Sequence, residues 1–166
     1  AGIGLMFQRP PTIRGLKIAL WGDLKYGRTT HSLIFALARF GADILFCPSP
    51  GLGVPDHVID KLIKEYGGEV EQVSGSTRDE EGNIFPVDAM YTPPDRSHQL
   101  AMIPDINIEI ELKEGVDALY VTRPQKERFE STETGSDAKN SYRVVNKQLL
   151  GGRPFRKSLV MHPLPR

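Results

Sequence analysis

Three short polar stretches of this 166-residue chain hold the side chains best suited to chemistry. They are GDLKYGRTTHS at 22–32, TRPQKER at 122–128 and HPLPR at 162–166. In the first stretch, Lys25, Arg28 and Thr29 accompany the backbone amides that open a predicted helix. Cationic side chains and free helix-opening amides both favour an anion. The first stretch therefore predicts an anion site.

The other two stretches add complementary groups. Arg123 presents a planar fork that suits a carboxylate, and Gln125 can donate or accept a hydrogen bond beside it. Pro163 and Pro165 have no amide hydrogen and restrict the backbone, which leaves carbonyl oxygens as acceptors at a fixed place. Together the stretches predict a site for a dicarboxylate that also carries an amide or amine.

Several of these polar residues also have purely structural interpretations. Arg28 is equally suited to bracing a loop. We interpret His31 and His162 as packing residues and Asp23 as a residue that orients Lys25 or caps an amide. The histidines are scattered and no zinc-type spacing occurs, so we expect no metal. The loop GDLKYGR is neither a P-loop nor GxGxxG, so it gives little support to nucleotide binding.

Strands and helices alternate along most of the chain and decide where the polar stretches lie. Apolar runs predict strands at 16–21, 42–47, 69–73, 117–122 and 158–161. Apolar residues at helical spacing predict helices at 29–40, 56–66 and 144–150. Each polar stretch therefore follows a predicted strand.

This alternation predicts an α/β fold: a doubly wound parallel sheet flanked by helices, of the Rossmann-like kind. The segment at about 74–114 is turn-rich and acidic and holds a proline pair, so we interpret it as an inserted excursion. Within it, the alternation in INIEIEL at 106–112 predicts a half-exposed strand. Ligands of such sheets bind at the carboxyl ends of the strands, where we expect the polar stretches to converge.

Composition and charge exclude other classes of function. The 21 Lys and Arg balance the 21 Asp and Glu, which argues against a nucleic-acid partner. The apolar runs fall far short of the roughly 20 residues of a membrane helix, and no signal-peptide pattern opens the chain, so we expect no membrane partner. Cys47 is the one cysteine, which we interpret as a buried strand residue. We expect a reducing, cytoplasmic location.

GDLKYGRTTHSL, LYVTRPQKERF and VMHPLPR together resemble the aspartate carbamoyltransferase family, whose members join carbamoyl phosphate and L-aspartate in pyrimidine biosynthesis. The match holds in order, approximate spacing and position relative to strands, and covers most of 15–46 and 116–166. It concerns the second, aspartate-binding half of the enzyme. The resemblance implies a hinge or linker at 1–15, an aspartate-binding α/β domain at 16–166 that lacks its C-terminal part, and a chain that is a fragment.

The resemblance also implies roles for single residues. Arg28 and Arg123 would hold the two aspartate carboxylates, with Gln125 in support. Leu164 and Pro165 would place backbone carbonyls against the carbamoyl nitrogen and the attacking amine. The supporting positions are Thr29, Pro163, Lys25, Tyr26, Glu127 and Arg128, of which the last four match domain and subunit contacts. No residue of this chain is implied to be catalytic, because the enzyme supplies orientation and charge, and no cofactor is implied.

The implied small-molecule partners are L-aspartate and carbamoyl phosphate. The resemblance also implies a carbamoyl phosphate domain, without which this chain is inactive. The implied assembly is a homotrimer, which further subunits can join. Two alternatives stay open. The first is another amino-acid carbamoyltransferase, such as the ornithine enzyme, although those siblings typically carry a cysteine where this chain has His162 and Pro163. The second is a non-catalytic interaction domain of a multifunctional pyrimidine protein, with 74–114 as its contact surface.

Overall fold

The computed structural model describes residues 13–72, 77–78, 84–85, 87–94, 115–123, 145–152 and 155–162. Its elements are, in chain order, β1 (Lys17–Gly22), α2 (Arg28–Arg39), β2 (Asp43–Pro48), α3 (Asp56–Tyr66), β3 (Glu69–Gln72), β4 (Thr77–Arg78), β5 (Ile84–Phe85), β6 (Ala89–Thr92), β7 (Ala118–Val121), α8 (Lys147–Gly151) and β8 (Leu159–Met161). The predicted strands and helices that fall on described residues are present, within three residues at each described end.

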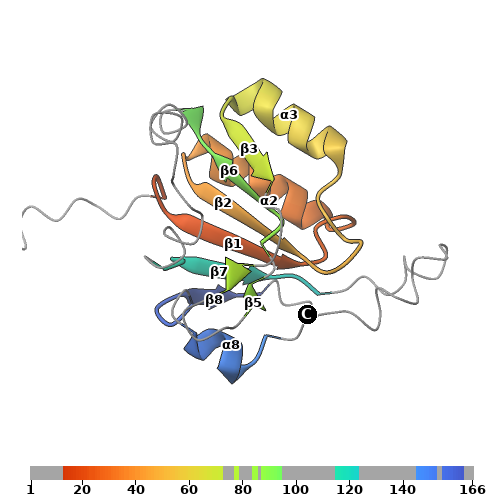
Figure 1. Ribbon diagram of the computed structural model, residues 1–166. Coiled ribbons are helices and arrows are strands. Elements are labelled where there is room, and N and C mark those ends of the chain that lie inside the picture. The colour runs from red at the N-terminus through yellow and green to blue at the C-terminus, as the bar shows by residue number, and fades with distance from the viewer. Residues whose placement is uncertain are drawn as a thin grey trace, which may run out of the picture.

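Six strands form one sheet in the order β3-β6-β2-β1-β7-β8 (Figure 1). β1 pairs in parallel with β2 on one side and with β7 on the other, and β7 pairs in parallel with β8. Because β2 and β7 flank β1, the winding direction of the chain changes at β1, as in doubly wound sheets. β4 and β5 form a separate two-stranded ladder. The predicted α/β, Rossmann-like class is confirmed.

One strand corrects the prediction of a parallel sheet. β6 runs antiparallel to both of its neighbours, β2 and β3. The described residues between β3 and β6 form the two short strands β4 and β5 in place of a crossover helix. A chain that returns directly beside its own strand pairs antiparallel, whereas parallel pairing requires a crossover. The sheet is therefore mixed.

The position of β6 also corrects the interpretation of 74–114 as an excursion from the sheet. All four residues of β6, Ala89 to Thr92, are buried, and they lie between β2 and β3. A strand buried on both faces has no alternation of apolar and polar residues to reveal it. The Pro93–Pro94 pair that follows indicated a turn instead. The strand predicted at 106–112 lies outside the described residues.

Apolar side chains fill both faces of the sheet. On one face, α2 and α3 pack against the sheet through a core that includes Leu20, Ile34, Phe46, Leu62 and Tyr91. On the other face, the core includes Trp21, Leu45, Cys47, Leu119 and Phe155, with Leu149 and Leu150 of α8 packed against it. Figure 1 shows α8 on the opposite side of the molecule from α3. The side chain of Cys47 is buried in β2, which confirms its interpretation as a buried strand residue.

The helix α8 begins later than the predicted start at 144. Asn146 is its N-cap, and the side-chain oxygen of Asn146 accepts a hydrogen bond from the Leu149 amide at 2.9 Å. Asparagine is among the strongest N-cap residues because it satisfies one of the free amides of the first turn. None of the helices in the described part of the chain combines the length and the apolar character needed to cross a membrane.

Candidate functional site

The carboxyl ends of β1, β2 and β7 lie side by side at one edge of the sheet, where hydrogen bonds join them. The Ser49 amide, just after β2, donates to the Gly22 carbonyl at 2.9 Å. The Thr122 amide, just after β7, donates to the Trp21 carbonyl, also at 2.9 Å. The predicted convergence of the first and second polar stretches is therefore confirmed where the structure describes them.

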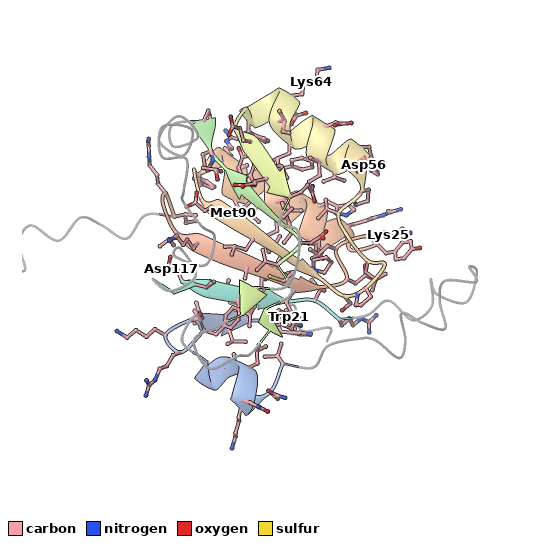
Figure 2. All side chains as sticks on the ribbon, viewed as in Figure 1. Trp21, Lys25, Asp56, Lys64, Met90 and Asp117 are labelled. Atoms are coloured by element: carbon pink, nitrogen blue, oxygen red, sulfur yellow. The ribbon has the colours of Figure 1, made fainter. Side chains whose placement is uncertain are left out.

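The start of the third stretch faces the same edge. β8 is parallel to β7 and pairs Tyr120 with Met161, so the carboxyl ends of the two strands lie together. His162 follows β8 directly and is exposed. Figure 2 shows Lys25 at this edge and Asp117, which precedes β7, at the opposite one. The side chains that follow β1, β7 and β8 thus share one edge.

Asp23 builds the turn that follows β1. Its side chain is only 1% exposed, and its Oδ1 atom accepts hydrogen bonds from the amides of Lys25 at 3.1 Å and Tyr26 at 3.0 Å. This confirms its interpretation as a residue that caps amides. The turn sends Lys25 into solvent, where its ammonium group lies 5.2 Å from the centre of the Tyr26 ring. A buried carboxylate therefore shapes this basic loop.

The loop is also tied to its neighbours. The Leu24 amide donates to the Leu52 carbonyl at 3.0 Å, which connects the loop to the segment after β2. Nε2 of His31, in α2, lies 2.8 Å from the Leu24 carbonyl oxygen and serves as its hydrogen-bond donor. His31 is half-buried, in agreement with its interpretation as a packing residue. These bonds hold the loop against both β2 and α2.

Arg28 opens helix α2 at the end of this loop, and both Arg28 and Thr29 are exposed. The N-cap, Gly27, has no side chain to cap the helix, and the first turn contains no acidic residue. No acidic residue within this turn therefore offsets the positive end of the helix dipole. With Arg28 and Lys25 nearby in the chain, this helix end has the electrostatics of an anion site.

Arg123 is exposed and follows directly after Thr122, whose side chain is buried. The Thr122 hydroxyl accepts a hydrogen bond from the Asp23 amide at 2.7 Å and donates to the Trp21 carbonyl at 2.9 Å. Arg123 thus follows a residue whose hydroxyl and amide are hydrogen-bonded to Trp21 and Asp23 at the end of β1. The two arginines predicted to bind carboxylates, Arg28 and Arg123, follow neighbouring strands at one edge.

The remaining predicted site residues lie outside the described residues. They are Gln125, Glu127, Arg128, Pro163, Leu164 and Pro165. Their roles stay predictions. The described residues contain no group of three His, Cys, Asp or Glu side chains that could hold a metal ion.

Two further polar residues at this edge have no recognisable signal in the sequence. Thr122 belongs to the second polar stretch, but only the fold brings its hydroxyl to Asp23. Ser49 directly follows β2, and its buried Oγ has no hydrogen-bond partner within the described structure. The same is true of the buried Oδ2 of Asp23.

The fold and this edge define a class of protein. A mixed six-stranded sheet with helices on both faces, a change of winding direction at β1 and exposed arginines after β1 and β7 make this an α/β domain of the Rossmann-like class. Its polar strand-end site lies where such domains bind ligands.

The comparisons with known proteins identify the relatives of the chain. No family model matches it. The chain is 36% identical over 154 residues to the aspartate carbamoyltransferase catalytic subunit of Methanopyrus kandleri. The matched region covers 93% of this chain and 38% of that protein. It is likewise 36% identical to the subunit of the same name from Methanothermobacter thermautotrophicus, over 93% of this chain and 37% of that protein.

Solved structures agree. The catalytic subunit of M. jannaschii aspartate transcarbamoylase matches with a TM-score of 0.51 and 29% identity, over 93% of this chain and 38% of that one. Aspartate transcarbamoylase from Trypanosoma cruzi, in complex with phosphate, matches with a TM-score of 0.54 and 27% identity, over 93% of this chain and 42% of that one. The chain is thus a relative of aspartate carbamoyltransferase catalytic subunits, and it spans about 38% of the length of the first of them. The resemblance drawn from the three motifs is confirmed.

Proposed function

We propose that this chain is the aspartate-binding part of an aspartate carbamoyltransferase. The observation that carries the proposal is the pair of exposed arginines, Arg28 and Arg123, which follow neighbouring strands at the switch point of the sheet. L-Aspartate carries two carboxylates, and each guanidinium group can bind one through a planar pair of hydrogen bonds. Two arginines on separate elements suit a dicarboxylate better than a substrate with one carboxylate.

The charge around Arg28 supports this assignment. Arg28 is the first residue of α2, so it lies at the same helix end as the free amides of the first turn, and no acidic residue in that turn competes for them. Thr29, which is exposed beside Arg28, is a supporting donor. Lys25 and Tyr26 form the rim of the loop, where we expect them to contact a neighbouring domain or subunit. Glu127 and Arg128 are expected to make contacts of the same kind.

The remaining residues of the second and third stretches complete the proposed site. Gln125 supports the carboxylate held by Arg123. The carbonyls of Leu164 and Pro165 accept hydrogen bonds from the carbamoyl nitrogen and from the aspartate amine, and Pro163 restricts the backbone that carries them. These roles follow from the motif match, and the names of the relatives support them.

The proposed reaction needs no cofactor. The neutral amine of aspartate attacks the carbamoyl carbon of carbamoyl phosphate, and a carbon–nitrogen bond forms. The bond from that carbon to the phosphate oxygen breaks, phosphate leaves, and the nitrogen loses a proton. The products are N-carbamoyl-L-aspartate and phosphate, the first committed to pyrimidine biosynthesis. This chain contributes orientation and positive charge to the transition state.

A carbamoyl phosphate domain must join this chain for turnover, because the two substrates bind to different halves of the enzyme. We expect the complete enzyme to be a cytoplasmic homotrimer. The structure of the T. cruzi relative holds phosphate, the second product of the proposed reaction. The names of the relatives support the aspartate enzyme over the ornithine enzyme.

Titration of the chain with L-aspartate tests the binding role. We expect Arg28→Ala and Arg123→Ala to weaken binding by about tenfold or more each, since hydrogen bonds between charged groups are strong. Arg39→Ala is the matched control, because Arg39 is exposed at the last turn of α2, away from the loop. Unchanged affinity in both site variants would reject the proposal.

A reconstitution assay tests the enzyme role. The chain is assayed for N-carbamoyl-L-aspartate formation alone and then mixed with a separately produced carbamoyl phosphate half of a relative. We expect activity in the mixture only, and its loss when the mixture contains Arg123→Ala. A silent mixture of two folded pieces that still bind their substrates would favour a non-catalytic binding domain.

A further inference from the structure

Thr122 joins the two strands that carry the proposed carboxylate-binding arginines. Its side chain is buried, with 6% exposure, and its hydroxyl bonds to two groups of the β1 end. It accepts from the Asp23 amide at 2.7 Å and donates to the Trp21 carbonyl at 2.9 Å, while the Asp23 carbonyl lies 3.4 Å away. The Thr122 amide also donates to Trp21.

The position of this hydroxyl in the sheet is informative. The parallel ladder between β1 and β7 runs from Ile18 paired with Ala118 to Trp21 paired with Val121. Beyond this last pair the two segments enter different loops, and ladder pairing no longer fixes the distance between their backbones. At this point the Thr122 hydroxyl accepts the hydrogen bond that the Asp23 amide donates. This hydrogen bond therefore connects the two segments beyond the last paired residues of β1 and β7.

The positions of both arginines that we propose bind carboxylates depend on this hydrogen bond. Arg123 is the next residue after Thr122. On the other strand, Asp23 shapes the turn through the Lys25 and Tyr26 amides, and that turn leads directly into Arg28 at the start of α2. A shift between Thr122 and Asp23 therefore changes the separation of the two guanidinium groups, even though neither arginine is altered.

We propose that Thr122 is a positioning residue that sets the separation of Arg28 and Arg123 and so selects a four-carbon dicarboxylate over a longer one. The inference rests on the proposed function. Thr122 does not touch the substrate and acts through the two arginines. Carboxylate pairs of different length fit the same two guanidinium groups only if these can move apart, and the buried hydroxyl bond opposes that movement.

The test compares the affinities of the chain for L-aspartate and L-glutamate, whose carboxylates differ in separation by one methylene group. Thr122→Val keeps the shape but removes the hydroxyl, and Thr122→Ser keeps the hydroxyl but removes the methyl group. We expect the valine variant to bind aspartate about tenfold more weakly and to lose most of its preference for aspartate over glutamate. We expect the serine variant to retain both.

Thr92→Val is the matched control. Thr92 is also buried, with 6% exposure, but it ends β6 at the opposite edge of the sheet, beside Glu69. Loss of a buried hydroxyl there is expected to change thermal stability without changing the ratio of the two affinities. A purely structural role of Thr122 would give the same result as this control. The ratio therefore separates positioning from general stabilisation.

Each outcome decides the matter. Folded Thr122→Val with the aspartate affinity and preference of the original chain overturns the inference and leaves the proposed function standing, provided that Arg123→Ala loses binding. If the valine variant does not fold, Thr122→Ala and Thr122→Ser take its place, because they differ by the hydroxyl alone, and equal preference in those two overturns the inference. An original chain that binds neither amino acid overturns the inference together with the proposed function.

Discussion

The imidazole of His31 lies with its Nε2 atom 2.8 Å from the carbonyl oxygen of Leu24, seven residues earlier in the chain. Leu24 is completely buried, so its carbonyl has little access to water. The bond therefore fastens the loop after β1 to the helix that follows it. The same loop carries Lys25 and leads to Arg28, which makes this contact part of the support of the proposed site.

Removal of this imidazole is expected to destabilise the protein. His31→Ala should lower the free energy of unfolding by about 0.5–1.5 kcal/mol more than Ser32→Ala, because it removes one hydrogen bond to a buried carbonyl. Ser32 is exposed in the same helix, and alanine raises helix propensity to a similar extent at both positions. Urea unfolding of the two variants measures the difference, and equal stability would contradict the role assigned to His31.

The carboxylate of Asp23 is expected to be essential for the turn it caps. Asp23→Ala leaves the Lys25 and Tyr26 amides without their acceptor, which should cost about 1–3 kcal/mol of unfolding free energy. Asp23→Asn keeps one side-chain oxygen and should cost less. Asp60→Ala, at an exposed position of α3, is the control and should change stability little. Thermal or urea unfolding would refute the cap if the variants at 23 and 60 were alike.

Two glycines are expected to respond in opposite ways to a methyl group. At Gly27, an added Cβ would lie 2.8 Å from Oγ1 of the buried Thr30 and 3.1 Å from the Asp23 carbonyl oxygen, so Gly27→Ala should cost about 1–3 kcal/mol. At Gly151, in the last turn of α8, no atom of the described residues outside the adjoining helix backbone lies within 4 Å of an added Cβ, and Gly151→Ala should add about 0.5–1 kcal/mol. Calorimetric melting of both variants tests the contrast, and a stabilised Gly27→Ala would show that the loop is not closely packed.

Truncation of a leucine side chain should cost much more stability in β7 than in the adjacent strand β8. Leu119 of β7 is completely buried, and Leu119→Ala should cost about 2–5 kcal/mol. Leu159 of β8 is 64% exposed, and Leu159→Ala should change stability by less than about 0.5 kcal/mol. Denaturant unfolding at two protein concentrations measures both. A cost at Leu159 that matched Leu119 would mean that another surface covers β8 in solution.

The helices and most strands could be predicted because they depend on residues that lie close together in the sequence. Helix α3 occupies 56–66, as its apolar spacing indicates, since helical periodicity depends on residues three and four apart. The strands β1, β2, β7 and β8 follow from short apolar runs bounded by turn residues. The candidate arginines were found for a related reason: Arg28 and Arg123 each belong to a motif that is contiguous in the chain.

The sequence by itself thus determined the α/β class, most element positions and the relationship to aspartate carbamoyltransferases, and it supplied the prediction that Arg28 and Arg123 bind carboxylates. Only the tertiary structure decided that β6 inserts antiparallel between β2 and β3, because a strand buried on both faces has no periodic pattern of its own. It also decided that Thr122 bonds to Asp23 across 99 positions of chain. Such a bond depends on how two strands are aligned in the sheet, and that alignment results from the packing of the whole domain.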